Sequence, residues 1–384
     1  MMIAALNDPR RQIAEIDMAL LWSSLLILTL GIVMVYSASI YVTESNNQPP
    51  AYYLVHHGMY LCVGLALGAF AFQIRLATWQ RLAPYLFLCG VLLLALTLVP
   101  GVGRHIKGAW RWIRLGPIGL QPSEFVKLFS LLYAADYTVR KIEIIHDLRR
   151  AFLPMAVAMS LIGGLLILEP DFGAFVVIVA IAMGILFLGG LRARLFAILT
   201  SVLLAAFTVL IVISPYRRAR FLGFMDPWAD PYGKGYQLSH SLIAFGRGEW
   251  FGVGLGASVE KKFYLPEAHT DFLLSIIGEE LGFAGVLLVI TLFAILVRRA
   301  FAIGRQCVQL ELFYSALVAM GIGIWFGVQG FINMGVNVGL LPTKGLTLPF
   351  MSYGGSGLVS NCIALAILLR VDWENRQIMR GKKP

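Results

Sequence analysis

Runs of about twenty apolar residues recur along the whole chain and limit the class of fold that it can adopt. A helix of that length crosses the hydrocarbon core of a bilayer, where every backbone polar group must be satisfied within the segment itself. Of the 384 residues, 59% are hydrophobic and only 14% are charged, which is too little polar surface to cover a soluble globule. The sequence therefore predicts an all-α polytopic membrane protein.

Ten transmembrane helices are expected, and an even number places both termini on one side of the membrane. The expected spans are residues 18–40, 52–73, 82–100, 123–139, 151–168, 174–190, 195–214, 272–297, 312–334 and 353–371. Most Lys and Arg residues fall on the terminal side, whereas the opposite loops 41–51 and 169–173 contain none, so the termini 1–17 and 372–384 are predicted to be cytoplasmic. We interpret residues 1–384 as a single membrane domain with a large periplasmic loop at about 215–270, between helices seven and eight.

Two outer loops depart from this charge pattern. Their cations are Arg104, Lys107, Arg111 and Arg114 in residues 101–122, and Arg217, Arg218, Arg220, Lys234, Arg247, Lys261 and Lys262 in the long loop. Clustered cations beside a membrane indicate an anionic partner, such as a phosphate or a lipid head group. Contact with ordinary anionic lipid is the alternative.

The sequence predicts no nucleotide-binding site, no zinc site and no structural disulfide. The glycine run at 246–256 matches neither the dinucleotide nor the phosphate-loop spacing and follows no expected strand, so no nucleotide is predicted. The six histidines and four cysteines lack ligand-like spacing, so a dedicated zinc site is not expected. No pair of cysteines falls on the outer side, and we predict no structural disulfide.

The first polar constellation joins the segment 108–113 to the start of the fourth span. Pro122 and Ser123 are typical of a helix start, and Glu124 and Lys127 stand three residues apart on one face. The two charges either neutralise each other so that the helix can enter lipid, or they form the wall of an outward-facing cavity. In the second case Arg111 is available to bind phosphate in a bidentate manner.

The second constellation is the turn Glu169-Pro-Asp-Phe-Gly173, which contains two carboxylates and no cation. Proline and glycine are explained by the turn alone, but the two acids are not. Asp171 either binds a metal or the substrate, or it caps the helix that follows.

The third constellation is Leu265-Pro-Glu-Ala-His-Thr-Asp-Phe272, which ends the long loop and leads directly into an apolar span. Glu267, His269, Thr270 and Asp271 thus lie at the mouth of a membrane helix, where an acidic side chain is costly and usually serves binding or chemistry. Asp271 is best placed to act as a general base. The alternative is that Thr270 or Asp271 caps the helix.

The fourth constellation is Leu341-Pro-Thr-Lys-Gly-Leu-Thr-Leu-Pro-Phe350, followed by Ser352-Tyr-Gly-Gly-Ser-Gly357. Lys344 is the only cation of this outer loop. The small residues allow either a phosphate or another backbone to approach the N-terminal end of the last span.

These four stretches together resemble the SEDS family of membrane peptidoglycan glycosyltransferases, over nearly the whole chain. Segments 226–232, 244–251 and 342–356 are more similar to the division-type members of Gram-negative bacteria than to the elongation type. The resemblance implies a protein of the bacterial inner membrane at the septum that polymerises lipid II with inversion and releases polyprenyl pyrophosphate. It also implies two kinds of partner, a division-specific class B penicillin-binding transpeptidase and other regulators of division.

By the same resemblance, Asp271 corresponds to the essential aspartate of the Leu-Pro-Glu-x-x-Thr-Asp motif and would deprotonate the attacking sugar hydroxyl. Arg111, Lys127 and Lys344 would stabilise the leaving pyrophosphate. A divalent cation, Mg²⁺ or Mn²⁺, would assist these side chains, and no nucleotide or organic cofactor is implied. The expected substrate-binding residues are Arg111, Trp112, Gln121, Ser123, Glu124, Lys127, Asp171, Arg217, Arg220, Lys261, Glu267, His269, Thr270, Lys344, Ser352, Tyr353 and Ser356.

A lipid II flippase is the main alternative of another class. It predicts charged residues through the whole membrane depth and paired repeats with broken helices. Here the polar residues gather toward the outer face and no internal repeat is found. An elongation-type polymerase is the alternative within the same chemistry.

Overall fold

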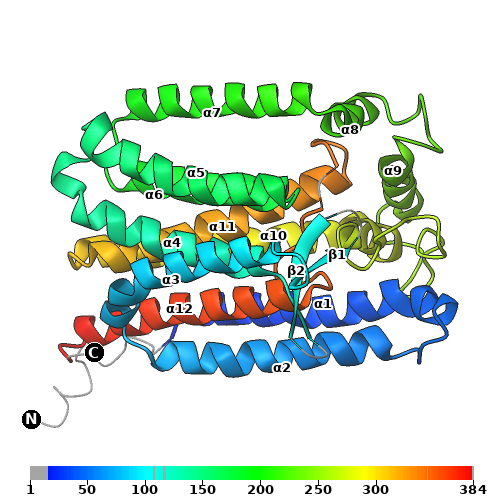
Figure 1. The fold of residues 1–384 in the computed structure, drawn as a ribbon. Coiled ribbons are helices and arrows are strands. Elements are labelled where there is room, and N and C mark those ends of the chain that lie inside the picture. Colours follow the sequence, from blue (N-terminus) through cyan, green and yellow to red (C-terminus); the bar gives the residue numbers. More distant parts are fainter. Residues whose placement is uncertain (1–15, 107–108, 116–117, 344, 383–384) are drawn as a thin grey trace, which may run out of the picture.

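The structure is a computed structural model, and it describes residues 16–106, 109–115, 118–343 and 345–382. In this described part, ten long helices lie side by side along a roughly common direction (Figure 1). They are α1 (Met18–Ser45), α2 (Tyr52–Gln73), α3 (Leu76–Thr97), α4 (Pro122–Arg140), α5 (Leu153–Leu168), α6 (Phe172–Leu188), α7 (Ala193–Ile213), α10 (Leu273–Gln309), α11 (Phe313–Asn337) and α12 (Gly355–Met379). The predicted all-α membrane fold is therefore confirmed.

Length and composition suit these helices to a bilayer. Among the described residues, eight helices are long and apolar enough to cross a membrane. The other two are α6, which is apolar but has 17 residues, and α4, which contains charged side chains. The chain is a multi-pass membrane protein.

Shorter elements occupy the connections between these helices. They are β1 (Gly103–Ile106), β2 (Ala109–Leu115), β3 (Ile118–Leu120), the turns η2 (Ile142–Ile144) and η3 (Leu148–Phe152), α8 (Pro215–Met225) and α9 (Tyr236–Gly248). The strands form an antiparallel sheet in the order β1-β2-β3, with Ile113 opposite both Gly103 and Leu120. Trp110, Trp112 and Ile113 are of the aromatic and β-branched types that are enriched in strands.

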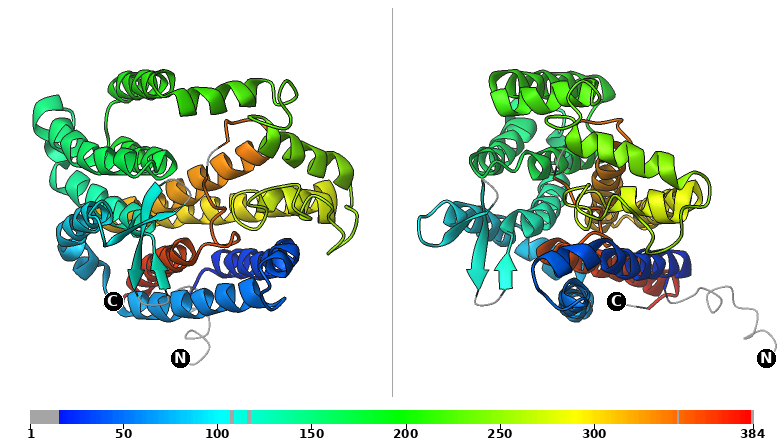
Figure 2. Two further views of the ribbon diagram at one scale, coloured as in Figure 1. Left: turned by 45° about the vertical axis from the view of Figure 1, so that its right-hand side comes forward. Right: turned by 90° about the vertical axis from the view of Figure 1, so that its right-hand side faces the viewer.

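The helices differ in how much they contribute to the core. Of the apolar stretch that would cross the membrane, 72% of the residues are buried in α11 and 89% in α12. In contrast, α7 has no buried residue. α7 lies at the edge of the bundle, apart from the central helices (Figure 2). Its Phe207 ring contacts Phe172 and Phe175 of α6. The remaining surface of α7 is therefore available to lipid.

α10 is broken near its N-terminal end at Gly282, whose φ of 68° is open to glycine but strained for other residues. The glycine-rich segment after α9 fits into this break through backbone hydrogen bonds. Val253 and Gly254 donate to the carbonyls of Glu279 and Glu280, at 2.9 and 3.1 Å. The glycines of 246–256 thus serve close backbone packing, and the loop is attached directly to α10.

Candidate active site

A cavity of about 980 Å³ opens at the end of the bundle where the sheet and α8 lie. Its walls come from β2, the start of α4, the α5–α6 turn, and the loops that precede α10 and α12. All four polar constellations therefore meet there, because each of them stands at the same end of a membrane helix. The expected site residues that line the cavity are Arg111, Trp112, Gln121, Glu124, Asp171, Arg220, Glu267, His269, Thr270, Asp271 and Tyr353.

One wall contains Asp271, in the last turn of the loop before α10. Phe272, rather than Asp271, takes the N-cap position of α10. The Thr270 hydroxyl donates to the Glu267 carboxylate within the loop, at 2.9 Å. A Cβ atom added to Gly345 would lie 3.1 Å from Asp271 Oδ2, so the facing loop is close to the carboxylate. The arrangement favours a cavity residue over a helix cap.

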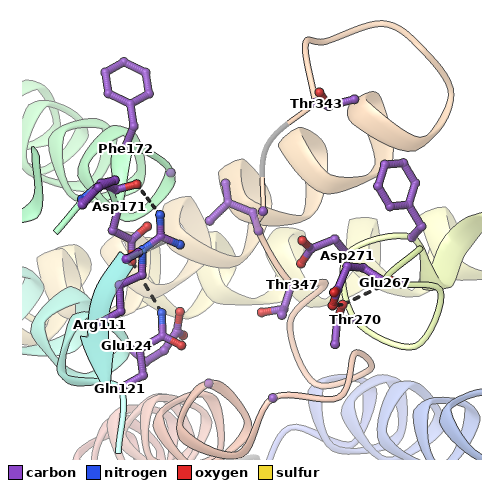
Figure 3. Close-up of a pocket in the computed structure, with 18 of the residues that line it drawn as sticks. Arg111, Gln121, Glu124, Asp171, Phe172, Glu267, Thr270, Asp271, Thr343 and Thr347 are labelled. Atoms are coloured by element: carbon purple, nitrogen blue, oxygen red, sulfur yellow. Dashed lines mark hydrogen bonds between the residues drawn. The ribbon is translucent and has the colours of Figure 1, made fainter. Parts of the chain in front are cut away.

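The opposite wall contains Arg111 and Asp171 (Figure 3). Arg111 of β2 donates from Nε to the Glu169 carbonyl, at 3.0 Å, and from Nη2 to the Pro170 carbonyl. These bonds attach β2 to the α5–α6 turn. Asp171 accepts from Ser123 Oγ at 2.9 Å and from the backbone N–H of Ala174 at 3.3 Å. Asp171 thus caps α6 and lines the cavity at the same time.

Three expected site residues lie behind the cavity wall. Lys127 is fully buried, with Nζ 2.8 Å from the Glu124 carboxylate and 2.8 Å from Gln329 Oε1. Ser123 donates to Asp171 and accepts from Gln121 Nε2 at 3.2 Å, and both of these partners line the cavity. Ser356 accepts from the Gln121 N–H at 2.8 Å. Glu124 and Lys127 therefore neutralise each other, and only Glu124 also lines the cavity.

The remaining expected residues lie elsewhere. Lys261 is buried against Glu280, with its Nζ 2.6 Å from Oε1, and does not line the cavity. Ser352 accepts from the Leu348 N–H within its own turn, at 2.9 Å. Lys344 lies outside the described residues, as does the side chain of Arg217.

Aromatic rings form the corner of the cavity beside the loop of Asp271. The ring of Tyr53, at the start of α2, lies 4.8 Å from that of His269 and 5.0 Å from that of Tyr353. Ring faces of this kind suit the apolar face of a cyclic substrate.

Four carboxylates, those of Glu124, Asp171, Glu267 and Asp271, line the cavity on two walls. Within the described part of the chain, no three His, Cys, Asp or Glu side chains come together as a metal site. Mg²⁺ is commonly held by one or two carboxylates together with substrate phosphates. The residues present fit that shared mode of binding, rather than a site made by protein ligands alone.

Glu169 is a buried carboxyl group directly behind Arg111, outside the membrane helices. Burial raises its pKa to about 7, and the nearby Asp171 adds to this, against a hydrogen bond from the Thr97 hydroxyl. The folded protein therefore binds more protons at this group than the unfolded chain between pH 4.5 and about 7. Its contribution lowers stability as pH rises through that range and is constant above it.

Replacing Glu169 by Gln should remove this dependence. We expect the variant to gain up to about 3 kcal/mol over the wild type at pH 8, and little at pH 4.5. Thermal unfolding in detergent at both pH values measures the difference. Glu143→Gln, at an exposed glutamate of η2, is the matched control. Parallel stability profiles for wild type and the Glu169 variant would contradict the assignment.

Comparison with known proteins agrees with the sequence motifs. The profile of the cell cycle protein family FtsW/RodA/SpoVE matches residues 18–377. The chain belongs to this family. A relative from Aromatoleum aromaticum, named a probable peptidoglycan glycosyltransferase FtsW, is 64% identical over 98% of this chain and 92% of its own. The FtsW of Burkholderia thailandensis is 55% identical over 97% of this chain and 82% of its own.

Solved structures of the FtsW/RodA/SpoVE family share the fold. A chain from a peptidoglycan synthase complex that coordinates polymerization and crosslinking has a TM-score of 0.74 and 31% identity, covering 94% of this chain and 98% of its own. RodA of Thermus thermophilus has a TM-score of 0.69 and 29% identity, covering 94% and 97%. The resemblance stated from the motifs is thereby confirmed.

Several cavity residues were missed in the sequence. Tyr53, Tyr60 and Thr347 line the cavity, and Asn333 and Asn337 lie behind the Asp271 loop. Two asparagines four residues apart within an apolar helix are a usable signal, because polar side chains in membrane helices are usually functional. The two tyrosines carry no such signal, since aromatic residues gather at every membrane interface.

Proposed function

We propose that the protein is a peptidoglycan glycosyltransferase that polymerises lipid II into glycan strands during septal wall synthesis. The observation that carries the proposal is the shared cavity, which has Asp271 on one wall and Arg111 on the other. It opens at the ends of membrane helices, where a substrate with a polar head and a lipid tail can reach both. The FtsW relatives, 64% and 55% identical to this chain, support the same activity.

In the proposed reaction, Asp271 takes the proton of the sugar 4-hydroxyl while that oxygen attacks the anomeric carbon of the growing strand. Polyprenyl pyrophosphate leaves from the opposite face, so the configuration inverts. A carboxylate is a much weaker base than an alkoxide, so proton transfer must accompany bond formation. A lone acidic residue near the attacking oxygen is sufficient for this step.

The leaving pyrophosphate needs positive charge in place before the bond breaks. Arg111 and Arg220 line the cavity, and carbonyls of the α5–α6 turn hold the Arg111 guanidinium. A divalent cation, Mg²⁺ or Mn²⁺, would be held jointly by the pyrophosphate and a cavity carboxylate and would supply further charge stabilisation.

The proposal includes a location and a partner. The cavity end of the bundle would face the periplasm of the inner membrane, with the long loop, and both termini would be cytoplasmic at the septum. A division-specific class B penicillin-binding transpeptidase would bind the protein, together with division regulators. The similarity to a chain of a peptidoglycan synthase complex supports this partner.

The test uses the purified chain with its transpeptidase, lipid II and a divalent cation. Glycan strands that shorten or disappear after chelation would support both the activity and the cation. Flipping of lipid II without strand synthesis would overturn the proposal in favour of a transporter. Depletion in cells separates the branches, because a division enzyme predicts filaments and an elongation-type polymerase predicts rounded cells.

Arg111→Ala should lower kcat/KM for lipid II by roughly 10- to 100-fold, because hydrogen bonds to a charged group are each worth about 1.5–3 kcal/mol. Arg111→Lys should recover only part of the loss, since an ammonium cannot reproduce the fork of donors. Steady-state strand synthesis measures both. Arg104→Ala is the control, because Arg104 is exposed on the neighbouring strand and does not line the cavity. Equal rates for the two alanine variants would contradict the role of Arg111.

A further inference from the structure

Two asparagines of α11 hold the backbone of the segment that carries Asp271. Asn333 Nδ2 and Asn337 Nδ2 each donate to the Asp271 carbonyl oxygen, both at 2.9 Å. Both asparagines are buried, at 2% and 0% exposure. A carbonyl just before a helix start has no partner within the helix, so these donors define where that peptide lies.

Asn333 also reaches the loop on the other side of Asp271. Its Nδ2 donates to the Leu346 carbonyl at 2.6 Å. Leu346 follows Gly345, the residue at which an added Cβ would lie 3.1 Å from Asp271 Oδ2. A second link joins the same segments, because the Tyr353 N–H donates to the His269 carbonyl at 3.0 Å. The Asn333 amide group thus sets the spacing between the Asp271 carboxylate and the loop that contains Gly345 and Leu346.

The orientation of the Asn333 amide follows from its neighbours. Two carbonyl oxygens face Nδ2, while Oδ1 is buried and accepts no hydrogen bond within the described chain. Turning the amide over would place three oxygens together. Asn337 is fixed separately, because its Oδ1 accepts from the Ser275 hydroxyl at 2.7 Å. The position of Asn333 therefore requires a donor, which neither an aspartate nor an apolar side chain supplies.

We propose that Asn333, assisted by Asn337, is a positioning residue for the reaction: it holds the Asp271 peptide and the 345–347 segment at the separation that the chemistry needs. The inference rests on the proposed function of Asp271. Asn333 touches neither the substrate nor the Asp271 carboxylate, and it acts through the backbone. Misplacing a catalytic group by about 1 Å can cost on the order of 100-fold in rate.

The test compares Asn333→Ala with Asn375→Ala. Asn375 is a matched control, since it is fully buried in α12 and donates to Cys307 Sγ at 2.9 Å, at the other end of the bundle. We expect Asn333→Ala to lower kcat for strand synthesis by roughly 10- to 100-fold with KM nearly unchanged. Asn375→Ala should retain the wild-type kcat. Equal kcat values for the two variants would overturn the inference.

A second measurement separates positioning from a general loss of structure. In a protein that already carries Asp271→Asn, adding Asn333→Ala should not reduce the residual rate further, because residues that act as one unit are not additive. If Asn333→Ala lowers the residual rate of the Asp271→Asn protein by the same factor as it lowers the wild-type rate, the role of Asn333 is structural instead. If Asn333→Ala does not fold, Asn337→Ala carries the test, with a roughly tenfold loss of kcat expected for one donor.

The two proposals fail in different ways. A wild-type protein that makes no glycan, or an Asp271→Asn variant that polymerises normally, contradicts the proposed function. An active wild type with an inactive Asp271→Asn variant, together with an Asn333→Ala variant that keeps the wild-type kcat, contradicts only the positioning role.

Discussion

Replacing Asp271 by Asn is expected to lower the rate of lipid II polymerisation by about 10²- to 10⁴-fold, the usual contribution of a general base. Asparagine has nearly the same shape as aspartate, so lipid II should still bind. It cannot accept the proton of the attacking hydroxyl. Strand synthesis by the purified protein with its transpeptidase measures the rate, and retention of radiolabelled lipid II measures binding.

Asp226→Asn is the matched control for this substitution. Asp226 is an exposed aspartate of the same long connection, and its Oδ1 accepts only from the neighbouring N–H groups of Trp228 and Ala229, at 3.2 and 3.1 Å. Its variant should polymerise at the wild-type rate. If Asp271→Asn also polymerises at that rate, Asp271 is not the base and the mechanism fails.

The convergence of the four constellations could be predicted because membrane helices constrain geometry strongly. A bilayer forces each long apolar run into a helix that begins and ends at an interface. Polar motifs that lie at one interface are then neighbours, whatever their separation in sequence. Arg111, Asp171 and Asp271 line one cavity for this reason.

The burial of individual charges could not be predicted in the same way. Lys127 and Lys261 were expected to bind substrate, because a cation near an outer loop suits an anionic ligand. The pair of Lys127 with Glu124 was one of the two alternatives stated from the sequence, but its other partner, Gln329, lies on α11. The partners of Lys261 are Glu280 of α10 and Ser37 of α1. A single sequence contains no signal for such pairings, so residue type alone cannot distinguish a buried ion pair from a substrate contact.

Local structure in the outer connections was predictable in part. The aromatic and β-branched residues of 109–115 favour a strand, but the short, charged loop was interpreted by its charge alone. The break in α10 has a weaker signal, since an isolated glycine is common in membrane helices. Gly282 is needed there because the 249–254 segment approaches the helix backbone, with Phe283 donating to the Glu249 carbonyl at 2.8 Å. Only the folded chain reveals that approach.

The largest expected effect on stability comes from Lys261→Met. The side chains of Lys261 and Glu280 are both 0% exposed, and Lys261 Nζ also donates to the Ser37 hydroxyl at 2.9 Å. Removing the ammonium leaves a buried carboxylate without its counter-charge, which typically costs about 3–5 kcal/mol. The loop after α9 should then separate from α10 and α1. Thermal unfolding in detergent, with limited proteolysis of the loop, measures the loss.

The adjacent Lys262 provides the control, because its side chain is exposed and only its Nζ approaches the Tyr41 ring, at 5.4 Å from the centroid. Lys262→Met should change stability by less than about 1 kcal/mol. The double variant Lys261→Met with Glu280→Gln should recover most of the loss, because no unpaired charge then stays buried. A Lys261→Met variant that unfolds like the wild type but binds lipid II weakly would contradict the ion pair. Lys261 would then be a substrate contact.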